Sequence, residues 1–216
     1  KPLRKRRYMF SESFYVISMA EYGLATGNKE AIKKAEECFE LMLSIYHDAK
    51  SDPFKITPKS YAETRSDRAS AVPMVLVSSA QVLRRCDPEK ADYYTAVAQE
   101  MVDAIINYHY KPEFKCVLEC VGPNGEFIDT PAGRCINPGH SMENSWFLMN
   151  QAIYTGDKEL LEKLGIPTSI LPEIIQPGEA YGMLSDELCR EFDCEPVPVI
   201  AVCTHDTASA VSAAPA

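Results

Sequence analysis

Residues 11–46 read SESFYVISMAEYGLATGNKEAIKKAEECFELMLSIY. This stretch predicts two helices joined by a tight corner, because glycine often ends a helix and asparagine often caps the next one. In the second helix apolar residues recur three or four positions apart, as at Ala35, Phe39 and Leu43. The sequence TGDKE at 155–159 repeats the TGNKE of 26–30. Repeated helical hairpins are typical of an α/α barrel or solenoid, although Gly-Asx corners also occur in other helical proteins.

Further helices are expected at 73–85, 87–106 and 140–154, and another begins at Asp157. The turn sequence GPNG at 122–125 lies between residues 116–121 and 126–129. These two flanking segments are therefore expected to pair as a short hairpin. The first three quarters of the chain are predicted to be mainly α.

The composition is that of a soluble globular protein. The chain has 216 residues, 46% hydrophobic and 25% charged, which excludes disorder throughout. No apolar run approaches the roughly 20 residues of a membrane span, and the basic start lacks the apolar segment of a secretory signal. The net charge of -9 argues against nucleic acid as a partner. We expect a cytoplasmic protein whose eight cysteines are reduced, mostly buried thiols, without a zinc site.

The chain changes character near residue 164. Residues 164–216 contain eight acidic residues, one basic residue, Arg190, and six of the fifteen prolines. The apolar run at 196–203 predicts a buried strand, and a polar turn at 204–207 then leads into a helix at 208–213. We therefore expect two domains, a helical one at 1–163 and a short α/β fragment at 164–216.

The segment from Glu119 to Trp146 is the richest in residues that could carry chemistry. His140 and Glu143 are three positions apart, so on a helix they share one face. A position near a helix N-terminus would keep the imidazole neutral and able to accept a proton, while Glu143 could orient the ring or hold a substrate hydroxyl. Arg134 and Asn137 could bind sugar oxygens, and Trp146 could provide an apolar wall. The alternative is that His140 is satisfied by local helix capping.

Several motifs resemble the N-acylglucosamine 2-epimerase family: YMFSESFY at 8–15, VPMVL at 72–76, PNGEFID at 123–129 and RCINPGHSME at 134–143. The resemblance covers about residues 1–163 and implies an (α/α)6 barrel around a sugar pocket. It also implies inversion or isomerisation at carbon 2 of an N-acylhexosamine or related hexose. A base removes the proton beside the carbonyl and an enediol-type intermediate forms, which requires no metal or redox cofactor. The expected partner is a small-molecule sugar.

Residue by residue, His140 matches the proton-transfer histidine of this family and Glu143 the glutamate that supports it. Other residues fall in segments that should face the pocket, namely Glu119, Arg134, Asn137 and Trp146. Tyr8 and Glu12 begin a helix whose end should face the pocket, and a structural role is equally open for both. An α/α-barrel glycosidase using Glu119 and Glu143 as its two carboxylates is a weaker alternative.

The chain departs from the family pattern in three ways, the first being that a substrate-binding arginine expected near the family's N-terminus lies outside it. The family barrel needs about twelve helices and only six are expected here, so apolar surface should be exposed. A second catalytic histidine should follow residue 163, and His205 lacks the right context for it. Low activity is therefore expected. The sequence does not distinguish a monomer from a homodimer.

The last part of the chain resembles rhamnulokinase, a member of the FGGY sugar kinases, through VPVIAV at 197–202 and HDTASAV at 205–211. The resemblance implies that Asp206 is the base that activates a sugar hydroxyl for attack on ATP. Without this resemblance, the sequence favours a role for Asp206 as a helix N-cap. ATP and magnesium would matter only to a complete kinase, whose nucleotide-binding half is absent. The sequence predicts a fusion of two fragments near Lys163. The alternatives to epimerase activity are that the chain acts as a sugar kinase fragment or that it is a non-catalytic fusion product.

Overall fold

The computed structural model describes residues 7–56, 67–163 and 179–200, and these belong to two compact units that divide after Ile166. The first unit is built from helical hairpins, each made of consecutive antiparallel helices. Its helices are α1 (Phe10–Thr26), α2 (Lys29–His47), α3 (Ala71–Cys86), α4 (Ala91–Ala104), α5 (Pro138–Thr155) and α6 (Lys158–Lys163). Shorter turns are η1 (Ala49–Ser51), η2 (Pro88–Lys90) and the π-helix η3 (Ile105–His109).

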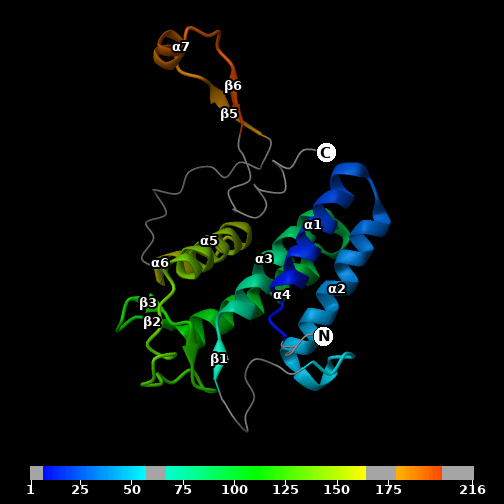
Figure 1. Cartoon of the computed structure of the whole chain (residues 1–216), viewed down its shortest axis with the longest axis vertical. Helices are drawn as coiled ribbons and strands as arrows, with labels where there is room; N and C mark the ends of the chain where they lie inside the picture. The colour runs from blue at the N-terminus through cyan, green and yellow to red at the C-terminus, as the bar shows by residue number, and fades with distance from the viewer. Residues whose placement is uncertain (1–6, 57–66, 164–178, 201–216) are drawn as a thin grey trace, which may run out of the picture. The chain divides into compact units, whose positions relative to one another are not determined.

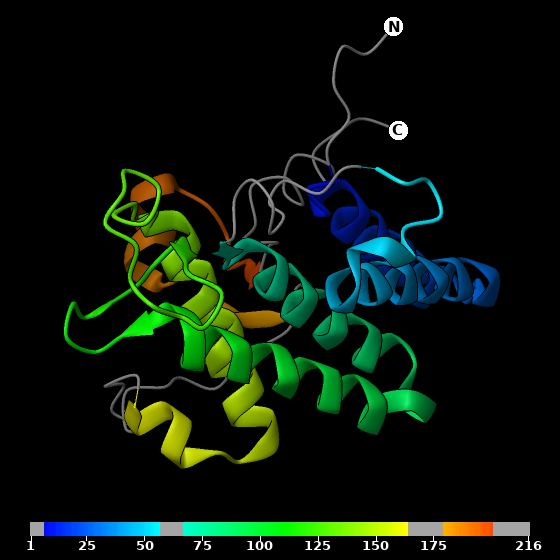
Figure 2. The same ribbon diagram turned by 90° about the horizontal axis from the view of Figure 1, so that it is seen from below.

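The helices of the first unit form two rows. Helix α3 contacts both α1 and α5, and these three make one row, while each of α2, α4 and α6 contacts the helix before it in the chain (Figure 1). Figure 2 shows the second row, α2, α4 and α6, along one side of the first. The mainly α fold with paired helices expected from the sequence is confirmed.

The two repeated corners have the same structure. Gly27 and Gly156 end α1 and α5 with φ of 71° and 72°, a left-handed conformation that glycine adopts without a steric penalty. The next residue caps the following helix in both cases. Asn28 Oδ1 accepts from Ala31 N at 3.2 Å, and Asp157 Oδ1 accepts from Leu160 N at 3.0 Å. The sequence repeat therefore encodes one helix-to-helix connection used twice.

The strands of the first unit are only two residues long and pair differently from the expected hairpin. Strand β1 (Arg68–Ala69) is antiparallel to β4 (Cys120–Val121), and β2 (Tyr110–Lys111) is antiparallel to β3 (Cys116–Val117). The turn at 122–125 does form, but 126–129 is not a strand, so the predicted hairpin is wrong. The reason is that residues 120–121 pair with β1, far away in sequence.

One apolar face of each helix builds the core between the rows. Fully buried side chains include Val16 on α1, Phe39 on α2, Leu76 on α3, Met101 on α4 and Leu148 on α5. The outer flanks of the first row are apolar and exposed, as expected from the sequence for an incomplete barrel. These exposed residues include Phe14 and Tyr22 on α1, and Met142, Trp146 and Ile153 on α5.

The cysteines differ in part from expectation. All seven in the described ranges are free thiols, but only Cys86 and Cys189 are buried, so the expectation of mostly buried thiols is wrong. Their scatter over several loops and exposed helix faces explains the difference. No helix within the described residues is long and apolar enough to cross a membrane.

The second unit contains β5 (Ala180–Met183), α7 (Asp186–Phe192) and β6 (Pro198–Ile200). Strands β5 and β6 are antiparallel, with Met183 opposite Pro198. The strand expected at 196–203 is therefore present in part, but its three residues are exposed rather than buried, because β5 is its one partner among the described strands. Residues 201–203, the helix expected at 208–213 and Asp206 lie outside the described residues.

Candidate active site

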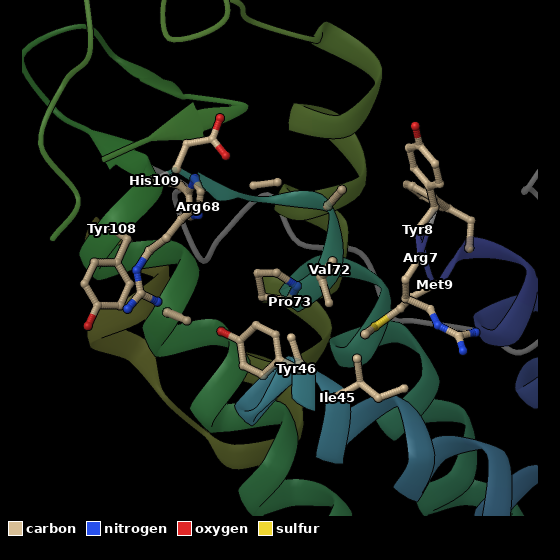
Figure 3. Close-up of a pocket in the computed structure, with 16 residues that line it drawn as sticks. Arg7, Tyr8, Met9, Ile45, Tyr46, Arg68, Val72, Pro73, Tyr108 and His109 are labelled. Atoms are coloured by element: carbon tan, nitrogen blue, oxygen red, sulfur yellow. The ribbon is translucent and has the colours of Figure 1, made fainter. Parts of the chain in front are cut away.

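An open cavity of about 290 Å³ lies at one end of the helical rows (Figure 3). It is bordered by the N-terminal ends of α1 and α3 and by the C-terminal ends of α2 and η3. Its walls are largely aromatic and apolar with a few polar groups, which is typical of a small-molecule site. Its lining includes Tyr8, Phe10, Tyr46, Arg68, Pro73, Tyr108 and His109.

The candidate base, His140, is paired with a carboxylate. His140 lies in the first turn of α5, and its Nδ1 is 2.9 Å from Glu119 Oε1. Both side chains are half-buried, at 28% and 19% exposure. Because a carboxylate accepts, the neutral imidazole carries its proton on Nδ1 and leaves Nε2 able to take a proton. The carboxylate that orients the imidazole is therefore that of Glu119, whereas the sequence suggested Glu143 for this role.

A ring contact joins this pair to the cavity. Phe10 lines the cavity and stacks on the His140 imidazole, with ring centroids 6.3 Å apart and planes 25° apart. The β1–β4 ladder also ties the pair to the start of α3, because Ser70 N donates to Glu119 O at 3.0 Å. His140 and Glu119 do not themselves line the cavity, and Phe10 is the lining residue that contacts His140.

The remaining predicted residues of this segment are placed less directly. Glu143 is half-buried on α5 and Trp146 is exposed, and neither lines the cavity. Arg134 is also exposed, and its Nη1 donates to Asp129 Oδ1 at 2.8 Å. The structure therefore brings together His140 and Glu119, with Asn137 just before them, and leaves Arg134 and Trp146 on the surface.

Asn137 caps α5: its Oδ1 accepts from His140 N at 3.3 Å. We expect Asn137→Ala to lower the free energy of unfolding by about 1 kcal/mol, because an orphan backbone donor loses its partner. Asn137→Asp should keep the cap and most of the stability. Urea denaturation followed by the fluorescence of Trp146, the only tryptophan, measures both variants. Equal stability of the Ala and Asp variants would contradict the capping role.

Tyr8 and Glu12 are held by different contacts at the start of α1. Tyr8 lines the cavity and is half exposed, as expected for a pocket residue. Glu12 instead pairs with Arg7, whose guanidinium also binds Asp52 with Nη2 to Oδ2 at 2.9 Å. The structural role left open for Glu12 is the one that the geometry favours.

The cavity residues that the sequence did not single out include Phe10, Arg68 and His109. The Arg68 guanidinium lies 4.3 Å from the centroid of the Tyr108 ring, and its Nε donates to Pro123 O at 2.6 Å. His109 is 2% exposed and its Nδ1 lies 3.0 Å from Leu118 O. Phe10 and His109 lie at helix ends and Arg68 lies in the two-residue strand β1, where a periodic pattern carries no information about which side chains meet.

Stability is expected to fall between pH 6.5 and pH 4 because of His109. Burial is the main cause that lowers the pKa of His109 from 6.5 to about 4, with further lowering by Lys111 and Arg68. In this window the unfolded chain takes up a proton that the folded protein does not, so the free energy of unfolding falls by about 3 kcal/mol at pH 4. Urea denaturation at pH 7 and pH 4 measures the loss, and His109→Asn should remove that share of it. An unchanged pH dependence in the variant would contradict the assignment.

Within the described ranges, no group of three or more His, Cys, Asp or Glu side chains is arranged to hold a metal ion.

The family model for N-acylglucosamine 2-epimerase (GlcNAc 2-epimerase) matches residues 1–164. The chain belongs to this family. The family barrel is of the (α/α)6 type, and the first unit therefore contains part of such a barrel.

Curated relatives agree with this assignment. The chain is 29% identical over 194 residues to the rat N-acylglucosamine 2-epimerase, covering 88% of this chain and 45% of the rat protein. It is 31% identical over 160 residues to the mouse protein, covering 74% of this chain and 37% of that protein. The chain thus spans less than half the length of these epimerases.

A second resemblance is also confirmed. The chain is 46% identical over 68 residues to the rhamnulokinase of Pectobacterium atrosepticum, covering 32% of this chain and 13% of the kinase. It is 34% identical over 68 residues to the rhamnulokinase of Lactiplantibacillus plantarum, covering 32% of this chain and 14% of the kinase. The chain therefore contains an epimerase-family segment and is also similar to a small part of a sugar kinase.

Proposed function

We propose that the first unit carries the proton-transfer chemistry of a sugar 2-epimerase or isomerase. Its substrate is an N-acylhexosamine or a related hexose. The observation that carries the proposal is the contact between His140 Nδ1 and Glu119 Oε1 at 2.9 Å, beside a cavity and within the segment that matches the family. The pair gives the imidazole a fixed orientation and a free Nε2, as a general base requires.

In this mechanism His140 Nε2 removes the proton from carbon 2 of the open-chain sugar. The electron pair of the C–H bond forms the carbon–carbon double bond, and the carbonyl oxygen at carbon 1 takes up a proton to give an enediol-type intermediate. Water then delivers a proton to the other face of carbon 2, the hydroxyl group at carbon 1 loses its proton to restore the carbonyl, and the imidazolium returns its proton to water, so that the centre is inverted. Glu119 stabilises the imidazolium that forms, while Phe10 holds the ring against the cavity wall. No metal or redox cofactor takes part in these steps.

Activity of the 216-residue chain alone is proposed to be low. The chain spans less than half the length of its epimerase relatives, and the apolar flanks of α1 and α5 are exposed where further hairpins would pack. A pocket closed on fewer sides holds a sugar less firmly and admits more water.

Solvent-deuterium exchange tests the proposal. The chain is incubated in D2O with N-acetylglucosamine, N-acetylmannosamine, glucose or mannose, and NMR follows the signal of the hydrogen on carbon 2. We expect loss of this signal for at least one sugar, at a rate proportional to protein concentration. The His47→Ala variant serves as a control, because His47 is an exposed residue paired with Glu100. A folded chain that exchanges carbon 2 of none of these sugars would refute the proposal.

A second candidate function follows from the 46% identity to part of a rhamnulokinase. In this alternative Asp206, which lies outside the described residues, removes the proton of a sugar hydroxyl as that oxygen attacks the γ-phosphate of ATP. ATP- and magnesium-dependent phosphorylation of rhamnulose, lost in Asp206→Asn, would support it. Sugar binding with neither activity would leave a non-catalytic chain.

A further inference from the structure

We propose that His109 binds the ligand of the cavity, with Nε2 accepting a hydrogen bond from one sugar hydroxyl group. The choice of a sugar as ligand rests on the proposed function. The contact itself rests on the position and bonding of His109. It would make His109 a residue that determines which sugars fit, distinct from the proton-transfer pair at His140.

The first observation is the place of His109 at the cavity. His109 ends η3 and lines the cavity, together with Tyr108 and Arg68 (Figure 3). His109 is 2% exposed with its cavity-facing surface included, so the imidazole is fixed by packing and only a small part of it borders the cavity. A buried polar ring at the wall of a cavity is well placed to fix the orientation of a ligand.

The second observation is the bonding of the ring. Leu118 O lies 3.0 Å from His109 Nδ1, and a carbonyl oxygen only accepts, so Nδ1 carries the proton. The neutral ring then presents Nε2 as a bare acceptor. Among the described residues no hydrogen bond to Nε2 is found, and the cavity is the space that His109 lines. Nε2 is therefore the ring atom to which a ligand in the cavity would donate.

The charge state of the ring supports an acceptor role. Burial keeps His109 neutral at physiological pH, since its pKa is lowered to about 4. A neutral imidazole with a protonated Nδ1 accepts a hydrogen bond at Nε2, whereas an imidazolium only donates. A hydroxyl group is the donor that a sugar offers. The competing explanation is that His109 serves only to hold Leu118 at the end of η3.

Two substitutions separate these explanations. His109→Asn keeps a side-chain N–H near the position of Nδ1, so Leu118 O retains a donor while the acceptor facing the cavity is lost. His109→Gln places an amide oxygen near the position of Nε2 and gives up the bond to Leu118. His47→Asn, at the exposed histidine paired with Glu100, is the matched control. Denaturation with urea checks that each variant folds.

Equilibrium binding is measured by titration calorimetry with N-acetylglucosamine and with its 3-, 4- and 6-deoxy analogues. In the wild-type chain one deoxy analogue should bind roughly tenfold to a hundredfold more weakly than the parent sugar. His109→Asn should weaken binding of the parent by a similar factor and abolish that discrimination. His109→Gln should restore part of both, and His47→Asn should behave as wild type.

The outcomes distinguish the inference from the proposed function. Wild-type affinity and unchanged discrimination in a folded His109→Asn chain overturn the inference, while His140-dependent exchange at carbon 2 would still support the proposed function. If no sugar of the set binds to the wild-type chain, the inference fails, while exchange at carbon 2 of another sugar would still support the proposed function. Weakened binding with lost discrimination in His109→Asn, together with partial recovery in His109→Gln, supports the contact.

Discussion

The His140→Gln variant is expected to exchange the hydrogen on carbon 2 roughly a thousandfold more slowly than the wild-type chain, because a positioned base contributes this much to proton transfer. Glutamine fills similar space but its amide cannot take up a proton. The variant should still fold, since the backbone N–H of residue 140 keeps its bond to Asn137. Deuterium exchange followed by NMR gives the rate. Exchange that persists at the wild-type rate would exclude His140 as the base.

Replacing Glu119 tests the pairing rather than the base. Glu119→Gln should slow exchange roughly a hundredfold, because the amide no longer stabilises the imidazolium and can offer a donor that favours the wrong tautomer. Nitrogen-15 chemical shifts of the imidazole report directly whether Nδ1 or Nε2 carries the proton. Glu113→Gln, at an exposed glutamate of the same region, is the control. An unchanged tautomer together with an unchanged rate in Glu119→Gln would contradict the role of Glu119.

The helices were predictable because each carries its own signal. Helix α2 shows a regular apolar period, and the corners at Gly27 and Gly156 are encoded by adjacent residues that end one helix and cap the next. A local pattern suffices for such elements. The strands lack this property, since β1 and β4 are two residues long and exist only because distant segments meet.

The candidate site was predictable only where a motif lies within one segment. The motif ending in His140 and Glu143 indicated the base, but the partner at Nδ1 proved to be Glu119, which lies 21 residues away and reaches α5 through tertiary structure. Phe10 and His109 belong to different helix ends, and nothing in their local sequences relates them to His140. Asn137 shows the opposite case, because its position before Pro138 already suits the cap that the structure contains.

Asp52→Ala is expected to lower the free energy of unfolding at pH 7 by about 4 kcal/mol, the cost of leaving a paired charge without its partner. Asp52 is 3% exposed and accepts from Arg7 Nε at 3.0 Å and from Phe54 N at 2.9 Å. Burial tends to raise the pKa of Asp52, but the Phe54 N–H and the Arg7 guanidinium outweigh it and hold the pKa below 3.8. The contribution is therefore present at neutral pH and lost as the pH falls below that ordinary value.

The contact between Arg7 and Asp52 also fixes one wall of the cavity. Arg7 lines the cavity beside Tyr8, and its ion pair with Asp52 joins the start of α1 to the segment after α2. Asp52→Asn should lose less stability than Asp52→Ala, because the amide oxygen can still accept from Phe54 N. Asp92→Ala, at an exposed aspartate on α4, should change stability by less than about 1 kcal/mol. If Asp52→Ala unfolds at the same urea concentration as Asp92→Ala, the ion pair does not hold the start of α1, and Tyr8 owes its position to packing alone.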